Sequence, residues 1–328
     1  MSTLSRRELL LSLPALVAAR KLLAQQAAPL QAGPLHQVTL AVSDVGRSLE
    51  FYQGLFGMPI QARHGDTVLL RIGDGPRFMA LMPAGPAGPR IDHWGVSIED
   101  YNLGRLMGQL ESLGLSRVTE GPGLSGGPLH SRMTAREGIP EVFIGDPDGL
   151  VTQLCAPSYC GGAGMLGDAC PLVEDSPTPG DLHLTGISHL TVNVSDPDAS
   201  NAFYQRVFGF DIQAYQAASP ILGVGPGSDF LMFIGAGNGG ARVNHACFYV
   251  TDFNVERVQG ALERHGIRPR EGNTAAPMVH YVSMRMPNRG GAPEGTPELY
   301  FLDPDGISIQ LQDPTYCGGG GYLGSVCS

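Results

Sequence analysis

Short apolar runs of two kinds alternate along the chain. Residues 36–42 alternate between apolar and polar with the two-residue period of a strand. Apolar residues within 49–56 then repeat at helical spacing, and Gly57 follows as a stop signal. Short strands are predicted within 67–82, and the cycle restarts with a strand at 91–98. The order strand, helix and three strands predicts a βαβββ unit.

This pattern is repeated in the second half of the chain. LHQVTLAVSDVGRSLEFYQGLFGMPIQA, from Leu35, parallels ISHLTVNVSDPDASNAFYQRVFGFDIQA, from Ile187. EGIPEVFIGDPDGLVTQL, from Glu137, parallels EGTPELYFLDPDGISIQL, from Glu294. The proline-rich and acidic stretch 171–182 is typical of a linker. We therefore expect an α+β fold of four βαβββ modules, paired into one domain at 34–170 and a second at 183–328.

Composition narrows the class of protein. Of the 328 residues, 42% are hydrophobic, which is enough to build two cores. The net charge of −10 argues against nucleic-acid binding driven by counterion release. Glycine (46) and proline (26) are abundant, as expected for many tight turns. No internal apolar run approaches the roughly 18 residues of a membrane span.

The first 28 residues differ in composition from the rest of the chain. Arg6 and Arg7 precede an apolar stretch at 9–19, and small residues follow at 24–28. This order is typical of a bacterial signal of the twin-arginine type, which is a receptor-read address. We expect export to the periplasm. If the segment is instead a retained basic amphipathic helix, the protein is cytoplasmic.

Three polar side chains recur at similar places in both halves. The set of the first half is His36, His93 and Gln153, and the set of the second half is His189, His245 and Gln310. Successive members are 57 and 60 residues apart in the first set and 56 and 65 residues apart in the second. Imidazoles and amide oxygens are metal donors, so each set is a candidate metal site. The alternative is a decayed site, or polar residues satisfied by hydrogen bonds.

These residues, the FYQGLFG and FYQRVFG helices and the DPDG turns resemble the vicinal oxygen chelate superfamily. This superfamily includes glyoxalase, bleomycin-resistance and extradiol-dioxygenase-like proteins. The resemblance extends from residue 34 to about 316. It implies that paired βαβββ units curl around a metal held by their first and last strands.

The second half resembles the extradiol dioxygenase signature more closely, along YFLDPDGISIQ from Tyr300 to Gln310. The resemblance implies that Tyr300 orients the substrate. Gln310 replaces the glutamate ligand of the signature, and a histidine expected before the tyrosine is missing. Phe143 stands at the tyrosine position of the first half. His280 is a candidate acid or base near the site.

Two imidazoles and a carboxylate are typical ligands of mononuclear Fe(II), so we expect a divalent metal, with Fe(II) favoured and Zn, Ni or Mn as alternatives. Gln310 leaves the site more positive, which favours a catecholate, an enediolate or a 2-oxo acid. The leading hypothesis is an extradiol-type ring-cleaving dioxygenase. The alternatives are a glyoxalase-like lyase or isomerase and a non-catalytic binding protein that sequesters a small molecule. A homodimer is compatible with each of them.

Four cysteines form two pairs, each ten residues apart, in glycine-rich segments that end the halves. They are Cys160 and Cys170, and Cys317 and Cys327. In an oxidising compartment each pair would form a disulfide, whereas a loop of small residues or a metal pair are the alternatives. Arg132 and Arg285 precede the EGxPE segments and are candidates to meet a substrate anion.

Overall fold

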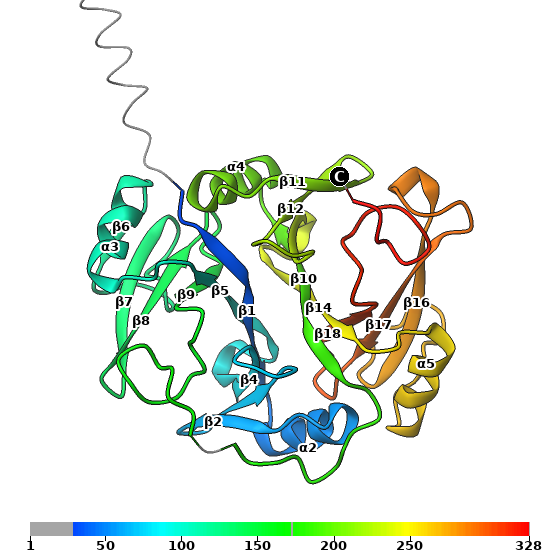
Figure 1. Cartoon of the computed structure of the whole chain (residues 1–328). Coiled ribbons are helices and arrows are strands. Elements are labelled where there is room, and N and C mark those ends of the chain that lie inside the picture. The colour runs from blue at the N-terminus through cyan, green and yellow to red at the C-terminus, as the bar shows by residue number, and fades with distance from the viewer. Residues whose placement is uncertain (1–28, 172, 328) are drawn as a thin grey trace, which may run out of the picture.

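The computed structural model describes residues 29–171 and 173–327, so the predicted signal segment lies outside the described residues. Each half forms one mixed sheet of nine strands (Figure 1). The first sheet has the order β2-β3-β4-β1-β5-β9-β8-β7-β6, and the second repeats it as β11-β12-β13-β10-β14-β18-β17-β16-β15. The predicted α+β architecture is confirmed. None of the described helices has the length and apolarity needed to cross a membrane.

The elements of the two halves correspond one to one, apart from an additional 3-10 helix in the second. The first half comprises β1 (Ala32–Val42), α2 (Val45–Phe56), β2 (Ile60–His64), β3 (Thr67–Arg71), β4 (Phe78–Pro83), η1 (Gly85–Ala87), β5 (Arg90–Ile98), α3 (Leu103–Ser112), β6 (Ser116–Val118), β7 (His130–Arg136), β8 (Ile139–Gly145) and β9 (Val151–Cys155). The second half comprises β10 (Leu184–Val194), α4 (Pro197–Phe208), β11 (Ile212–Gln216), β12 (Ser219–Gly223), β13 (Phe230–Gly235), η2 (Gly237–Gly239), β14 (Arg242–Val250), α5 (Val255–Arg264), β15 (Arg268–Pro269), β16 (Val279–Arg285), η3 (Pro287–Arg289), β17 (Thr296–Leu302) and β18 (Ser308–Gln312).

The first helix of each half begins and ends at the residues that the sequence favours. Asp44 accepts a hydrogen bond from the backbone N–H of Arg47, and Asp196 caps α4 in the same way. Gly57 and Gly209 end the two helices with φ of 65° and 68°, a left-handed conformation that glycine adopts without steric cost. Both helices are therefore fixed at each end before β2 and β11 begin.

The two halves share one hydrophobic core. Tyr204 of α4 stacks on Trp94 of the first sheet, with ring centroids 6.4 Å apart. Phe51 of α2 packs against Phe301 of the second sheet at 6.2 Å. Each of these helices thus contacts the opposite half as well as its own. Successive side chains of β10 point to opposite faces of the sheet. Leu190 therefore enters this core, while its neighbours point to the other face.

Reciprocal polar contacts join the halves at the DPDG turns. Asp305 accepts hydrogen bonds from Ser43, and Asp148 accepts the equivalent bonds from Ser195. Tyr52 of α2 donates to Asp303 at 3.0 Å, within the second DPDG turn. The turns that resemble a family signature therefore serve here as connections between the halves.

Burial gives Asp146, in the first DPDG turn, an unusual charge state. Asp146 is 1% exposed, and burial raises its pKa to about 7 although two backbone N–H groups donate to Oδ1. Because the pKa is raised in the folded state, protonated Asp146 stabilises the fold. This stabilisation is fully present below pH 3.8, the ordinary pKa, and is lost as the pH rises through about 7.

We expect Asp146→Asn to remove this dependence while keeping an oxygen for the two N–H donors. From pH 5 to pH 8, the free energy of unfolding of the wild type should fall by about 2–3 kcal/mol relative to the variant. Urea denaturation at both pH values measures it. Asp66→Asn, at an exposed turn, is the control for the exchange of aspartate for asparagine itself. A constant difference for Asp146→Asn would contradict the expectation.

Each half ends in a glycine-rich loop closed by a disulfide. The bonds join Cys160 to Cys170 and Cys317 to Cys327, so the disulfide alternative is confirmed for both pairs. The remaining cysteines, Cys155 and Cys247, are buried and free.

Candidate metal centre of the second half

A cavity of about 260 Å³ lies on the face of the second sheet opposite the shared core. His189 and Thr191 of β10 reach it because they alternate with the core residues Leu190 and Val192. The other lining residues come mainly from the strands around β10 and from the loops beyond them. They are Gln216, Phe230, Met232, Ile234, Asn244, His245, Tyr281, Ser283, Arg289, Glu298, Tyr300, Gln310 and Tyr316.

The structure brings His189 and His245 together. Their Nε2 atoms are 3.3 Å apart. Nδ1 of His245 lies 2.9 Å from the side-chain oxygen of Asn244, which can only accept, so this nitrogen carries the proton. Nδ1 of His189 lies 3.1 Å from the hydroxyl of Ser188. Asn244 thus leaves the Nε2 lone pair of His245 free to face the cavity, and Ser188 leaves that of His189 free when its hydroxyl accepts from Nδ1, as in histidines that bind metals.

Both imidazoles are held in the neutral form that binds metals. Burial lowers the pKa of His245 to about 4. Burial lowers the pKa of His189 well below its ordinary value, and the nearby His245 lowers it further. Gln310 lies near both rings and opposes part of these shifts. At neutral pH neither ring carries a charge that would repel a cation.

Gln310 is 1% exposed, and neither of its amide atoms has a partner of hydrogen-bond geometry among the described residues. Its neighbour across the ladder is Tyr300. The Tyr300 ring lies edge-on to His245 at 5.2 Å. Burial, with Glu298 nearby, raises the pKa of Tyr300 well above its usual range, so its phenol stays protonated. Amide, phenol and two imidazoles therefore surround one part of the cavity.

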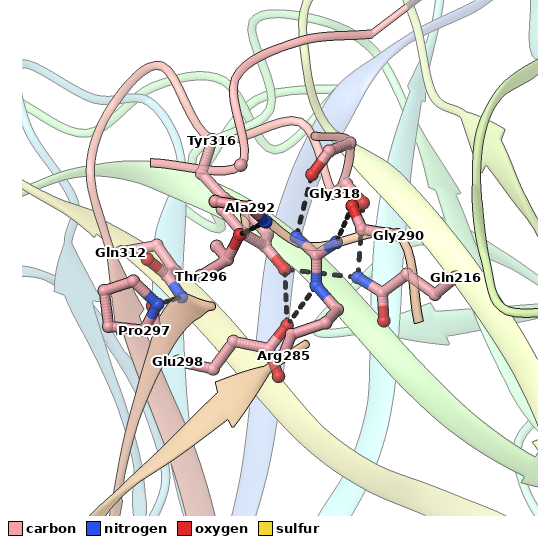
Figure 2. Close-up of polar contacts among 12 residues, drawn as sticks. Gln216, Arg285, Gly290, Ala292, Thr296, Pro297, Glu298, Gln312, Tyr316 and Gly318 are labelled. Carbon is pink, nitrogen blue, oxygen red and sulfur yellow. Dashed lines mark hydrogen bonds and ion pairs between the residues drawn. The ribbon is translucent and has the colours of Figure 1, made fainter. Parts of the chain in front are cut away.

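Glu298 is the only acid among the described residues that line the cavity, and it was not among the site residues predicted from the sequence. Arg285 donates to its Oε1 at 2.8 Å, and Tyr316 donates to the same oxygen at 3.1 Å (Figure 2). Tyr300 donates to Oε2 at 3.3 Å. The signal was present in the sequence, because Glu141 occupies the same place in the repeated EGxPE segment. There too an arginine, Arg136, and a tyrosine donate to the carboxylate.

Strand pairing also corrects the arginine assignment. Arg285 pairs with Thr296 at the end of its hairpin, and the residue at that end of the first half is Arg136. Arg132 lies further along β7, so it is not the counterpart of Arg285. Arg285 is fully buried against Glu298, so it does not meet the cavity as a free cation.

His189, His245 and Gln310 fit a divalent ion. Metal–nitrogen bonds are about 2.0–2.1 Å long, so nitrogens 3.3 Å apart can share one ion. The unpaired Gln310 amide would supply a third donor. Among the described residues no cluster of three or more His, Cys, Asp or Glu is arranged to hold a metal, which agrees with a set that contains only two such residues.

The expectation that His36 occupies the place of His189 is wrong by one residue. Gln37 pairs with Phe78 of β4, as His189 pairs with Phe230 of β13. His36 therefore corresponds to Ser188. Nε2 of His36 is used up by the carbonyl oxygen of Tyr159 at 2.5 Å, and such a contact requires the nitrogen to donate. A bulge between Leu35 and Gln37 keeps His36 beside Phe78 and Tyr159, with ring centroids 6.2 and 6.1 Å away, so His36 lies next to the position of His189 without occupying it.

In the first half, the corresponding residues bind each other. Gln37 donates to Gln153 at 2.6 Å, and Thr39 donates to Gln37 at 2.7 Å. His93 lies 3.2 Å from the Thr39 hydroxyl, and its other nitrogen contacts Asp92 at 2.9 Å. A single imidazole remains, and the Gln153 oxygen is already an acceptor. The first half thus matches the hydrogen-bonded alternative better than a metal site.

His280 does not reach the cavity. It lies on β16 between Val279 and Tyr281, and Tyr281 is the neighbour that faces the cavity. The His280 ring instead lies 3.4 Å from Glu263 of α5, on the opposite face of the sheet. The alternation of strand side chains explains why an acid or base role there is not supported.

The connection between β16 and β17 distinguishes the second half from the first. It spans residues 286–295, whereas β7 and β8 are joined by residues 137–138 alone. Arg285 holds the longer connection by donating to the Gly290 carbonyl at 2.9 Å (Figure 2). The connection places Arg289 at the cavity, where it is the only arginine or lysine among the described lining residues.

Solved structures share this fold at low sequence identity. The 2,3-dioxygenase LapB of a Pseudomonas species is 16% identical with a TM-score of 0.59, and the match covers 87% of this chain and 93% of LapB. A Mn(II)-bound glyoxalase of Novosphingobium aromaticivorans is 13% identical with a TM-score of 0.56, covering 86% and 82%. The 2,2',3-trihydroxybiphenyl 1,2-dioxygenase of Sphingomonas wittichii is 19% identical with a TM-score of 0.54, covering 90% and 91%. At this identity the likeness shows the fold alone.

No curated protein matches the sequence. The family model described as Glyoxalase/Bleomycin resistance protein/Dioxygenase superfamily matches residues 34–154 and again 186–311. These two segments make up most of the chain and coincide with the two sheets. The chain therefore belongs to the glyoxalase/bleomycin resistance protein/dioxygenase superfamily, with two copies of its fold in tandem.

Proposed function

We propose that the second half is a metal-dependent enzyme that opens the ring of a small catechol with O2. The observation that carries this proposal is the pair of neutral imidazoles, 3.3 Å apart, beside the unpaired Gln310 amide and the protonated Tyr300 phenol. Structures that share the fold include a catechol 2,3-dioxygenase and an extradiol ring-cleaving dioxygenase, which supports the reaction class.

His189, His245 and Gln310 would hold the ion, with Fe(II) favoured. A bound divalent ion would supply a Lewis acid for the substrate hydroxyls and, as Fe(II), the capacity to activate O2. Tyr300 lies beside His245 and can orient a substrate oxygen through its phenol. Glu298 holds that phenol by accepting a hydrogen bond from its O–H at 3.3 Å.

The charges favour an anionic substrate. All three metal donors are neutral, so a dication keeps its full charge there. Arg285 and Glu298 neutralise each other, while Arg289 adds a positive charge at the cavity. A catecholate, with or without a further acidic group, would therefore suit the site better than a neutral ligand.

Oxygen consumption by Fe(II)-loaded protein tests the proposal. We expect one O2 consumed per ring, with both oxygen atoms in the product, when catechol or 3,4-dihydroxybenzoate is supplied. The activity should be lost in His245→Ala and retained in His93→Ala. Protein that holds stoichiometric iron but consumes no O2 with any catechol would contradict the dioxygenase assignment.

A glyoxalase-like lyase or isomerase is the second candidate, favoured by one observation. The carboxylate of the cavity is Glu298, which forms no metal-binding cluster with the two histidines; among the described residues its Oε2 has only the 3.3 Å contact with Tyr300, so this oxygen is the candidate to move a proton. Turnover of a 2-oxoaldehyde adduct without O2 uptake would select this candidate. Tight binding of a small molecule without turnover would select the sequestering class.

Gln310→Glu tests the third donor directly. A carboxylate at this buried position should bind a dication more strongly than an amide, so we expect at least about a tenfold gain in Fe(II) affinity, since even outer-shell changes alter metal affinity by 10–100-fold. Competition with a chromophoric chelator measures the affinity. Gln153→Glu in the first half is the matched control and should leave it unchanged. An unchanged affinity in Gln310→Glu would exclude position 310 as a ligand.

We also propose that the protein is exported. Two disulfides among the described residues support an oxidising compartment, where such bonds persist. Replacing Arg6 and Arg7 by lysine should retain the protein in the cytoplasm of a host with a twin-arginine pathway, as cell fractionation would show. Unchanged periplasmic localisation would contradict the twin-arginine route.

A further inference from the structure

A cleft of about 510 Å³ lies between the halves, away from the candidate metal centre. One wall comes from the end of α2, the end of β3 and the turn that follows it. The other wall is the start of β10, at residues 183–185. Its basic side chains are Arg71, Arg77 and His183, and Asp74 is the only acid among the described lining residues.

The repeat provides an internal comparison for this cleft. An equivalent cleft of about 370 Å³ is formed by the end of α4, the end of β12 and the start of β1. Strand pairing places Gly223 where the first cleft has Arg71, because β3 and β12 pair with their neighbours in the same register. Gln31 takes the place of His183. The carbonyl of Gln31 accepts from the N–H of the residue directly after β5, and the carbonyl of His183 accepts from the N–H of the residue directly after β14.

Between the two clefts, the largest change of charge is at the position of Arg77, where the second half has Asp229. Arg77 precedes Phe78 of β4, and Asp229 precedes Phe230 of β13. Asp229 is used to join the halves, because its carboxylate accepts from the Leu35 N–H at 3.2 Å. Since the same fold forms both clefts, the fold itself does not require the basic residues of the first one.

The arginines retain unused donors. Arg71 donates from Nε to Gln61 at 2.9 Å, and its terminal nitrogens have no hydrogen bond among the described residues. Arg77 donates to the Thr185 carbonyl at 3.4 Å and lies near enough to Asp229 to lower the pKa of that carboxyl. Part of the Arg77 charge is therefore balanced, whereas that of Arg71 is offset only by Asp74 nearby.

We infer that this cleft between the halves is a binding site for a small oxyanion, a phosphate or carboxylate group of a ligand. Guanidinium groups present paired N–H donors that match the oxygens of such anions. The ligand would contact both halves, since His183 and Thr185 belong to one and Arg71 to the other. Its binding would therefore stabilise their association.

Calorimetric titration of the intact protein, without added metal and at constant ionic strength, tests the inference. Inorganic phosphate and malonate are the two probes, and the tighter one identifies the phosphate or the carboxylate source. We expect a dissociation constant on the order of 1 mM or tighter for at least one probe. Arg71→Gln with Arg77→Gln should weaken that binding at least about tenfold.

Three further variants keep the test decisive. Arg71→Lys retains the charge and should preserve part of the affinity. It replaces the double variant in the titration if the double variant does not fold. Arg268→Gln, at an exposed position of the far strand β15, should change nothing. Loss of binding in Arg289→Gln instead would place the anion at the candidate metal centre and overturn the inference. Equal binding in the wild type and the double variant, or none in the wild type, would overturn it too.

Discussion

Replacing His245 by alanine is expected to abolish stoichiometric metal binding and to lower ring-opening activity by more than about 100-fold. The substitution removes one of two imidazoles whose Nε2 atoms lie 3.3 Å apart. Loss of outer-shell partners alone costs 10–100-fold in metal affinity or activity, so loss of a ligand should cost more. Elemental analysis after reconstitution with Fe(II) measures the metal, and oxygen uptake measures the activity.

The repeat supplies a matched control for this variant. His93 occupies the equivalent strand position in the first half, but it lies among Thr39, Asp92 and the bonded pair of glutamines. We expect His93→Ala to retain the wild-type metal content. If His93→Ala lost the metal and His245→Ala kept it, the first half would be the metal-binding one and the proposed function would be misplaced.

Arg285→Met should destabilise the protein by about 3–5 kcal/mol, the range for removal of one partner of a buried ion pair. Arg285 is fully buried and donates to Glu298 and to the carbonyls of Gly290 and Gly319. Methionine fills much of the same volume, so the loss would report the uncompensated Glu298 charge and the two released carbonyls rather than a void. Urea denaturation measures the free energy of unfolding.

Arg136→Met in the first half is the comparison for that loss. The Arg136 side chain is 18% exposed and Glu141 11%, so water compensates part of the charge that remains. We therefore expect a smaller loss than for Arg285→Met. A loss below about 1 kcal/mol in Arg285→Met would mean that the second-half network contributes no more than a surface ion pair.

The fold could be predicted from the sequence because its signals are local and appear twice. Strand alternation at 36–42, the helical spacing before Gly57 and the repeated segments were sufficient to predict four βαβββ units. The order of strands within the sheets and the exchange of helix contacts between halves could not be predicted in this way. They depend on contacts such as Phe51 with Phe301, between residues far apart in the chain.

The candidate site could be predicted only in part. His189, His245, Gln310 and Tyr300 all line the cavity, as their strand positions suggested. The first half was misaligned by one residue, although the spacing from Gln37 to His93 matches that from His189 to His245. A histidine next to the right position is more conspicuous than a glutamine at it, and only the pairing with β4 separates them.

The reciprocal bonds between the DPDG turns and the serines before α2 and α4 have an evolutionary consequence. Two separate copies of a half-length chain would form the same contacts as a symmetric pair, and each mutation would then alter both subunits at once. Joining the copies in one gene removes this constraint. Gln37 could then replace a histidine, and Arg71 could face an anion, without the same change at His189 or Gly223. A tandem arrangement thus allows each copy to change independently of the other.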